Sequence, residues 1–396
     1  MIPHVLPIRF LLNPKADRAK SYGPGERSVL DGEANALAFQ EISSWEGYEP
    51  TPLLELPLLA RRLGIGALWY KDEGNRLGLG SFKALGGAYG VFRVLKQKIE
   101  NAGMGPVSSI DLRAGKYAEL VHQVTVTCAS LGNHGRSVAR GAAMFGCRAV
   151  IFLPDDTAPD RVAAIEDMGA GIAPVRGSYD DAVAMAARRA KEEGWFVVSD
   201  TAYPGYEEVP RYIMQGYTVM AREAVAQLGE ENHPTHLFLQ AGVGGMAAAV
   251  TGFFWEEFGP GRPTVTVVEP AEADCLLETA LSGRLNPSRG SLRTAMSCLA
   301  CRDPSTLAWR ILEAGADAFL SVPDYAAVET VAMLAGGSRG DPPIRSQPSG
   351  VAGLTGLMAT AFEPTLSSPL NLDKDSVVLV IGSEGPAIEH RSSPRE

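Results

Sequence analysis

Short runs of β-branched and aromatic residues alternate along the chain with longer amphipathic segments. The short runs have the length and composition of buried β-strands and cover residues 67–70, 124–127, 149–153, 236–239, 264–268 and 377–381. Between them, helical spacing and alanine-rich faces predict helices over residues 135–145, 160–168, 180–193 and 208–227. This alternation predicts an α/β fold in which helices flank mostly parallel sheets on both faces.

The length of 396 residues is enough for about two or three domains, and no linker separates independent units. We therefore expect a second domain inserted into the first. The prediction is a discontinuous larger domain made of residues 1–90 and 226–396, and a smaller α/β domain made of residues 91–225. In such folds, ligands bind where the carboxyl ends of strands lead into loops and helix N-termini.

Charge and composition exclude several classes of protein. The net charge of −10 and the absence of a basic run argue against a nucleic-acid partner. Pro7 and Arg9 interrupt the apolar stretch at residues 5–12, which is too short to cross a bilayer, so we expect a cytoplasmic protein without a membrane partner. Five cysteines form no secreted framework, and the pair Cys298 and Cys301 lacks a second pair, so no metal site is expected.

Lys83 is the strongest candidate for chemistry. It lies between Phe82 and Ala84, in a stretch whose next charged residue is Arg93. Burial there would lower the pKa of the amine and free it for covalent reaction with a carbonyl group. The alternative is an ordinary lysine at the start of a helix that extends its charged end to solvent.

Two predicted strands end in polar residues. Asn133 follows the strand that ends near residue 128, and Ser383 follows the strand that ends at residue 381. Both side chains could contact a ligand, with the Ser383 hydroxyl suited to a ring nitrogen. Turn formation or helix capping is the alternative for each of them.

A third loop is rich in glycine. Gly242, Val243, Gly244, Gly245 and Met246 follow the strand at residues 236–239 and lead into a helix. Bare backbone amides at a helix N-terminus suit a phosphate group. The same loop also fits a dinucleotide fingerprint, with Glu269 at the end of the next strand, so a nicotinamide-dependent dehydrogenase is an alternative.

Together these motifs resemble the fold type II, or tryptophan-synthase-β-like, enzymes that depend on pyridoxal 5'-phosphate (PLP). The landmarks occur in the family's order: Tyr48-Glu49-Pro50-Thr51-Pro52-Leu53, Ser81-Phe82-Lys83, Gly132-Asn133-His134-Gly135, Gly242-Val243-Gly244-Gly245-Met246 and Ser383. The resemblance implies that Lys83 binds PLP covalently, with Phe82 beside it. It also implies that Asn133 contacts the ring, that residues 242–246 hold the phosphate and that Ser383 meets the pyridine nitrogen.

Within that group the chain most resembles the diaminopropionate ammonia-lyases. The motifs that carry this likeness are Lys71-Asp72-Glu73, Asp200-Thr201-Ala202, Ile213-Met214-Gln215-Gly216-Tyr217 and Thr294-Ala295-Met296-Ser297-Cys298-Leu299-Ala300-Cys301. The resemblance implies a homodimeric lyase that converts a β-substituted amino acid into a 2-oxo acid and ammonia. Lys83 would take the Cα proton and Asp200 would bind or protonate the β-substituent. The substrate pocket would include Ser130, Leu131, His134 and Tyr203.

Because the sequence departs from the ammonia-lyase pattern at two positions, the chemical identity of the leaving group is undecided. Leu131 stands where those enzymes carry an aspartate, and Gln347 stands where they tend to have a glutamate. The resemblance implies attack on one stereoisomer and a more apolar pocket, which suits a β-hydroxy or aryl substrate such as phenylserine as well as 2,3-diaminopropionate. A β-replacement synthase similar to the cysteine synthases is one alternative, and a catalytically inactive member of the fold that retains the cofactor is another.

Overall fold

A computed structural model describes residues 7–130, 132–337 and 340–386 and contains two β-sheets. The seven-stranded sheet has the order β1 (Arg9–Leu12), β10 (Ala318–Val322), β9 (Thr264–Pro270), β8 (His236–Gln240), β11 (Val377–Gly382), β3 (Ala67–Asp72) and β2 (Leu53–Glu55). Its two edge strands are antiparallel and its inner strands are parallel. The four-stranded sheet is parallel, with the order β6 (Gly171–Val175), β5 (Arg148–Pro154), β4 (Thr125–Ala129) and β7 (Phe196–Val197).

Helices pack against both sheets, and their bounds are as follows: α1 (Pro24–Arg27), α2 (Gly32–Ser43), α3 (Pro57–Leu63), α4 (Lys83–Asn101), α5 (Ser109–Arg113), α6 (Ala118–Val121), α7 (Asn133–Phe145), α8 (Pro159–Glu166), α9 (Tyr179–Glu193), α10 (Glu208–Leu228), α11 (Gly245–Phe258), α12 (Cys275–Ser282), α13 (Thr306–Gly315), α14 (Asp324–Gly336), α15 (Ala352–Ala361) and α16 (Pro364–Leu370). Short 3₁₀ turns lie at Arg76–Gly78, Glu230–Asn232, Gly259–Gly261, Ser297–Leu299 and Pro348–Val351. The α/β class predicted from the alternation of strands and helices is confirmed.

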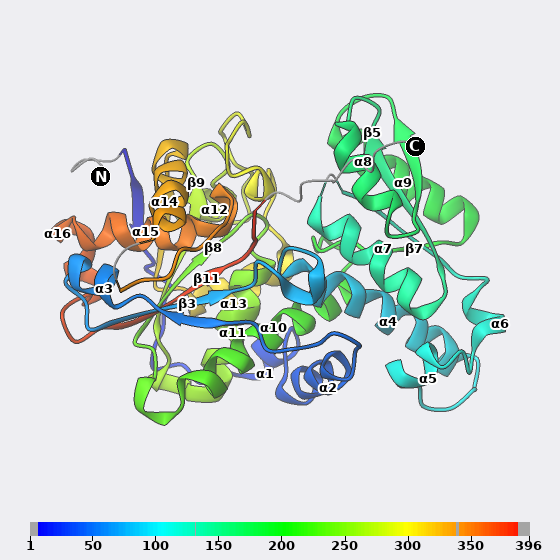
Figure 1. Cartoon of the computed structure of the whole chain (residues 1–396), viewed down its shortest axis with the longest axis horizontal. Coiled ribbons are helices and arrows are strands. Elements are labelled where there is room, and N and C mark those ends of the chain that lie inside the picture. Colours follow the sequence, from blue (N-terminus) through cyan, green and yellow to red (C-terminus); the bar gives the residue numbers. More distant parts are fainter. Residues whose placement is uncertain (1–6, 131, 338–339, 387–396) are drawn as a thin grey trace.

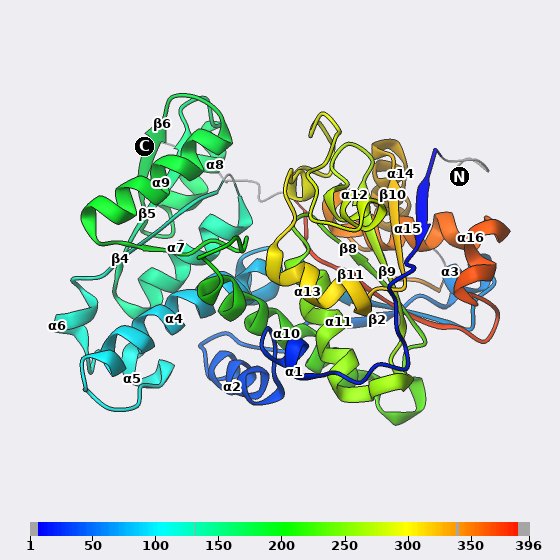
Figure 2. The same cartoon turned by 180° about the vertical axis from the view of Figure 1, so that it is seen from behind.

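The two sheets form two lobes, which Figures 1 and 2 show from opposite sides. In the larger lobe, side chains alternate across the sheet because successive strand residues point to opposite faces. Leu237 and Leu239 of β8 belong to the core that includes α10 and α11, whereas Phe238 between them packs on the side of α3 and α15. The strands of the smaller sheet lie between residues 125 and 197, and the strands of the larger sheet lie before and after them in the sequence. The boundaries 1–90, 91–225 and 226–396 stay a prediction.

Helices α4, α7 and α10 connect the lobes, and small residues on α4 allow them to approach closely. A Cβ atom on Gly86 would lie 2.3 Å from Cε1 of Tyr217 in α10. A Cβ atom on Gly87 would lie 2.7 Å from Cβ of Ser137 in α7. Glycine at both positions is therefore required for the packing that places the start of α4 between the lobes.

The strand order assembles the candidate site. Strands β8, β11 and β3 are parallel neighbours, so their carboxyl ends meet at one edge of the larger sheet. The glycine loop follows β8, Ser383 follows β11, and the segment leading to Lys83 follows β3. From the smaller sheet, the segments after β4 and β7 supply Asn133 and Asp200. Open α/β sheets bind their ligands at such an edge. In the described part of the chain, no helix is long and apolar enough to cross a membrane.

Candidate active site

Lys83 and Asp200 form an ion pair at the junction of the two lobes. Lys83 is the first residue of α4, and Asp200 lies in the segment between β7 and α10. Nζ of Lys83 donates a hydrogen bond to Oδ2 of Asp200. About a fifth of each side chain is exposed, at 21% and 20%. The structure therefore brings together the two residues that the sequence analysis selected as catalytic.

This pairing corrects the expected protonation of Lys83. Burial lowers the pKa of the amine, as the sequence suggested, but the carboxylate of Asp200 outweighs burial and raises the pKa above its usual value. Burial likewise raises the pKa of Asp200, and the adjacent Lys83 outweighs this and holds it below its usual range. Both groups are therefore charged at neutral pH in this structure. The sequence analysis missed the effect because the two residues are 117 positions apart.

The glycine loop has a backbone geometry that could hold an anion. Gly244 has φ 96°, in the left-handed region that favours glycine, and caps α11. Ala248 donates the first hydrogen bond within the helix to the Gly244 carbonyl, so the preceding amides remain available for a ligand. A Cβ atom on Gly245 would come no closer than 3.9 Å to described atoms. Space is thus available in front of a helix N-terminus, where a phosphate is favoured.

Neighbours support the cradle from behind. The carbonyl of Val243 accepts a hydrogen bond of 2.9 Å from the amide of Ser305. A Cβ atom on Gly242 would lie 2.8 Å from Sγ of Cys301. Met246 is buried at the start of α11. These contacts hold the backbone of the loop in place and leave no room for a side chain at Gly242.

Asn133 faces the larger lobe from the first turn of α7. Its Nδ2 donates a hydrogen bond of 2.9 Å to Oε2 of Glu384, so its side chain does not cap the helix. The hydroxyl of Ser130 performs that task by accepting a 2.8 Å hydrogen bond from the amide of Gly135. Nε2 of His134 is 2.7 Å from the carbonyl of Val198. Leu131, the pocket residue expected between them, lies outside the described residues.

Ser383 and Phe82 lie side by side through a backbone contact. The amide of Phe82 donates a 3.1 Å hydrogen bond to the carbonyl of Ser383. Ser383 is buried, and its amide donates a 3.2 Å hydrogen bond to the carbonyl of Gly350. This arrangement suits a hydroxyl that meets a ring nitrogen beside Lys83.

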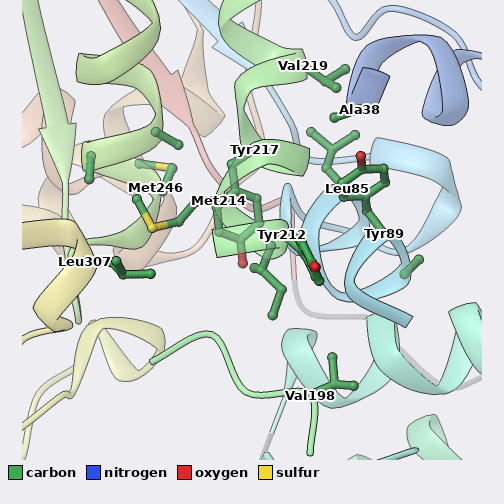
Figure 3. Packing of buried hydrophobic residues seen from close by; sticks show 14 of the residues in the cluster. Ala38, Leu85, Tyr89, Val198, Tyr212, Met214, Tyr217, Val219, Met246 and Leu307 are labelled. Atoms are coloured by element: carbon green, nitrogen blue, oxygen red, sulfur yellow. The ribbon is translucent and has the colours of Figure 1, made fainter. Parts of the chain in front are cut away.

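Tyr217 is a site residue that the sequence analysis did not select. Its ring centroid lies 4.7 Å from that of Phe82, and Nζ of Lys83 lies 5.7 Å from its ring. Figure 3 shows Tyr217 on α10 between Met246 and Leu85. Its hydroxyl is buried and has no partner in the described part of the chain. The quoted motif at residues 213–217 contains this residue, so its position in that motif was the available signal.

Tyr203, expected in the substrate pocket, is 46% exposed. Its ring stacks on that of Tyr206, with centroids 5.1 Å apart and planes inclined by 23°. Tyr206 is anchored because its hydroxyl donates a 2.9 Å hydrogen bond to the carbonyl of Val197. The segment after Asp200 therefore presents an aromatic surface three residues away from that carboxylate.

A buried ion network lies between β3, the turn after it and α10. Lys71 donates a 2.7 Å hydrogen bond to Glu223, and Arg76 binds both Glu223 and Glu73 at 2.7 Å. The side chains of this network are at most 2% exposed. Two cations and two carboxylates balance in charge. The network fixes α10, which carries Tyr217, against the larger sheet.

The alternatives for Glu269 and for the Cys298–Cys301 pair find no support in the geometry. The carboxylate of Glu269 accepts hydrogen bonds of 2.8 Å from the amides of Leu276 and Leu277 at the start of α12. It therefore caps a helix and is not presented to a ribose.

The cysteine pair makes separate contacts. Sγ of Cys298 donates a hydrogen bond to Glu384, whereas Sγ of Cys301 lies next to Gly242. Among the described residues, no group of three or more metal-binding side chains could hold a metal ion.

Comparison with known proteins decides the family. The model of the "Pyridoxal-phosphate dependent enzyme" family matches residues 45–383. The chain belongs to this family. This PLP-dependent enzyme is 39% identical over 370 residues to diaminopropionate ammonia-lyase of Escherichia coli strain K12, with 91% of each chain covered. It is 38% identical over 379 residues to the enzyme of the same name from Salmonella typhimurium strain LT2, with 93% of each chain covered.

Solved structures agree with this assignment. The holo form of diaminopropionate ammonia-lyase from Escherichia coli superposes on this PLP-dependent enzyme with a TM-score of 0.85 at 36% identity, covering 96% of this chain and 94% of that one. A crystal structure of the same protein in complex with an aminoacrylate-PLP azomethine reaction intermediate gives a TM-score of 0.84. The tryptophan-synthase-β-like fold and PLP as the cofactor, both expected from the motifs, are thereby confirmed. The roles of the individual site residues stay predictions.

Proposed function

We propose that this PLP-dependent enzyme is a lyase that removes the β-substituent of an α-amino acid and yields a 2-oxo acid and ammonia. The observation that carries the proposal is the Lys83–Asp200 pair beside a glycine cradle with room for a phosphate. The similarity to diaminopropionate ammonia-lyase over 91% of both chains supports it.

The residues present fit the cofactor. The backbone amides at the start of α11 would hold the phosphate, the Ser383 hydroxyl would meet the pyridine nitrogen, and Asn133 would contact the ring. The amides at the start of α11 have capacity left in the structure, since they precede the first helical hydrogen bond, from Ala248 to Gly244. Bound there, PLP supplies an electron sink for the negative charge that develops at Cα when its proton is removed.

Lys83 and Asp200 would perform the proton transfers. Nζ of Lys83, once neutral, accepts the Cα proton, and its position on the first turn of α4 holds it at the junction of the lobes. Asp200 stabilises the charged amine that results. The electron pair left at Cα then forms a double bond to Cβ as the bond from Cβ to the leaving group breaks. Hydrolysis of the released product by water gives the 2-oxo acid and ammonia. The leaving group departs with the electron pair of its bond and takes up a proton. Asp200 is placed to bind or relay that proton because it already contacts Nζ.

We infer that the leaving group is an amine or a hydroxyl. In sequence, Leu131 replaces the aspartate of the ammonia-lyase pattern, and an apolar residue at the pocket position that the resemblance implies would favour a less polar substrate. The stacked rings of Tyr203 and Tyr206 provide a flat aromatic surface in the segment after Asp200. Both features suit a β-hydroxy amino acid with an aryl group, such as phenylserine, alongside 2,3-diaminopropionate.

A substrate panel with product stoichiometry tests the proposal. Purified holoprotein is incubated with each enantiomer of 2,3-diaminopropionate, serine, threonine and phenylserine, and the 2-oxo acid and ammonia are both quantified. A diamino acid yields two molecules of ammonia for each 2-oxo acid, whereas a hydroxy amino acid yields one. Turnover that requires an added thiol would instead identify a β-replacement synthase and contradict the lyase. The Lys83→Ala variant should lack both turnover and the visible absorbance of covalently bound cofactor.

We further propose that the enzyme is a homodimer, as the resemblance implies. Light scattering coupled to gel filtration should then give twice the mass of one 42.0 kDa chain. A mass equal to that of a single chain across the accessible protein concentrations would contradict this assembly.

A further inference from the structure

Glu384 occupies a central position that the proposed mechanism does not use. It follows Ser383 at the end of β11 and is 4% exposed. Its backbone forms an isolated antiparallel bridge with Ser81, two residues before Lys83. Its carbonyl also accepts a 2.6 Å hydrogen bond from the hydroxyl of Ser346. The backbone of Glu384 is therefore held on two sides, which restricts the direction of its side chain.

The carboxyl group of Glu384 meets donors from two other segments. Oε2 accepts a 2.9 Å hydrogen bond from Nδ2 of Asn133 and a 3.3 Å hydrogen bond from Sγ of Cys298. Among the described residues, no Lys, Arg or His forms an ion pair with it, although Lys83 is near enough to act on it electrostatically. Burial raises the pKa of Glu384. Buried carboxyl groups that lack a cation partner are uncommon and occur at functional sites.

The bond between Glu384 and Asn133 joins the two lobes. Asn133 begins α7 of the smaller lobe, whereas Glu384 follows a strand of the larger sheet, and the two are 251 positions apart. The amide group of asparagine has two N–H donors and one acceptor oxygen. Glu384 takes one donor, and the same nitrogen makes only a long 3.9 Å contact with Sγ of Cys298, so the amide oxygen is left for a ligand. The contact therefore fixes the rotation of the amide without consuming its capacity to bind a ligand.

We propose that Glu384 is a positioning residue that orients the Asn133 amide toward the ring of the cofactor. The inference rests on the role given to Asn133 in the proposed function. A neutral or charged carboxyl group can accept this hydrogen bond, so a glutamine at the same position retains an acceptor oxygen. An alanine removes the acceptor and leaves the Asn133 side chain free to rotate, which costs conformational entropy when the cofactor binds.

A double-mutant cycle on cofactor affinity tests the inference. The dissociation constant of PLP and the absorbance maximum of the holoprotein are measured for wild type, Asn133→Ala, Glu384→Ala and the double variant. We expect each single change to weaken PLP binding by about tenfold, the effect of about one hydrogen bond. The double variant should be weakened by about the same factor and not by the product of the two. The Glu384→Gln variant should bind PLP within about threefold of wild type.

Asp341→Ala serves as the matched control. The carboxylate of Asp341 accepts hydrogen bonds of 2.8 and 2.9 Å from the amides of Leu58 and Leu59 at α3, away from the site. Its loss should lower stability by about 1 kcal/mol, as for other helix caps, without changing PLP affinity. A weakened affinity in this control would show that lost stability alone explains the Glu384 variants and would overturn the inference.

Three results of the cycle would also overturn it. Additive losses near a hundredfold would mean that Glu384 and Asn133 act separately. Tighter PLP binding in Glu384→Ala would mean that Glu384 withholds Asn133 from the cofactor. An unchanged affinity in either single variant would remove the positioning role. Release of 2-oxo acid by wild type is measured in parallel. If wild type releases 2-oxo acid but the two substitutions show no coupling, only the inference about Glu384 is rejected. If the substitutions are coupled but wild type releases no 2-oxo acid, only the proposed function is rejected.

Discussion

Replacing Asp200 with asparagine tests whether this carboxylate controls the protonation of Lys83. The change keeps the size of the side chain and removes the charge that outweighs the burial of the amine. A hydrogen bond to a charged group contributes about 1.5–3 kcal/mol, and 1.36 kcal/mol corresponds to about one pKa unit. We therefore expect the pKa of Lys83 to fall by about 1–2 units. At a fixed pH below the pKa, the neutral fraction of the amine should rise about 10- to 100-fold.

Only the neutral amine reacts with the aldehyde of PLP, so the rate of covalent attachment reports this pKa. In wild type the raised pKa keeps the amine charged as pH increases, and the rate should reach half of its maximum only at high pH. Asp200→Asn should move this midpoint downward by about 1–2 units. The assay is stopped-flow visible absorbance after apoprotein is mixed with PLP between about pH 6 and pH 10. This range lies below the wild-type midpoint, so a lower midpoint in Asp200→Asn appears as a rate about 10- to 100-fold higher at the same pH.

A matched control separates the local effect from a general change in protein charge. Glu192→Gln removes one negative charge from an exposed position on α9, where Glu192 pairs with Arg188 and Arg189. Its midpoint should equal that of wild type, because exposed charges are screened by solvent and salt. An Asp200→Asn midpoint equal to that of wild type, or higher than it, would refute the reasoning, since Asp200 would then not set the protonation of Lys83.

Three other substitutions have defined outcomes. Glu223→Ala leaves Lys71 and Arg76 buried with Glu73 as their remaining carboxylate. The free energy of unfolding measured by urea denaturation should therefore fall by about 3–5 kcal/mol. A fall below about 1 kcal/mol would contradict the stabilising role of the network. The Gly245→Ala variant should unfold at the same temperature as wild type, because the added Cβ meets no atom closer than 3.9 Å. A titration with PLP should nevertheless show binding at least about tenfold weaker, because the Cβ occupies the space in front of the helix N-terminus. Tyr217→Phe removes a buried hydroxyl that has no hydrogen-bond partner among the described residues. The unfolding temperature of the variant should therefore equal or exceed that of wild type. A marked fall in the unfolding temperature would reveal a hydrogen bond absent from this structure.

Local patterns in the sequence were sufficient for the elements and for several site residues. The predicted strands all occur, within about two residues of their expected ends, because buried parallel strands require continuous apolar runs. The glycine loop was recognisable because glycine leaves its backbone amide uncovered by a side chain and adopts the positive φ of Gly244 without steric cost. Asn133 and Ser383 were selected as candidates because each follows a predicted strand, where such folds bind ligands. Lys83 was selected because its neighbours Phe82 and Ala84 are apolar and its motif resembles that of the family.

What only the tertiary structure decided is which of these residues meet. The order of β8, β11 and β3 depends on side chains that pack across the whole sheet, and neither this order nor the edge strands β1 and β2 follow from local periodicity. The protonation of Lys83 was predicted in the wrong direction because its partner is remote in sequence, and a charge at contact distance outweighs burial. The sequence analysis also overlooked Glu384, because its hydrogen-bond partner Asn133 lies on the other lobe and 251 positions away in the sequence. Sequence patterns report the local backbone preferences of each segment, whereas electrostatic and hydrogen-bonding partners depend on distances that exist only after the chain has folded.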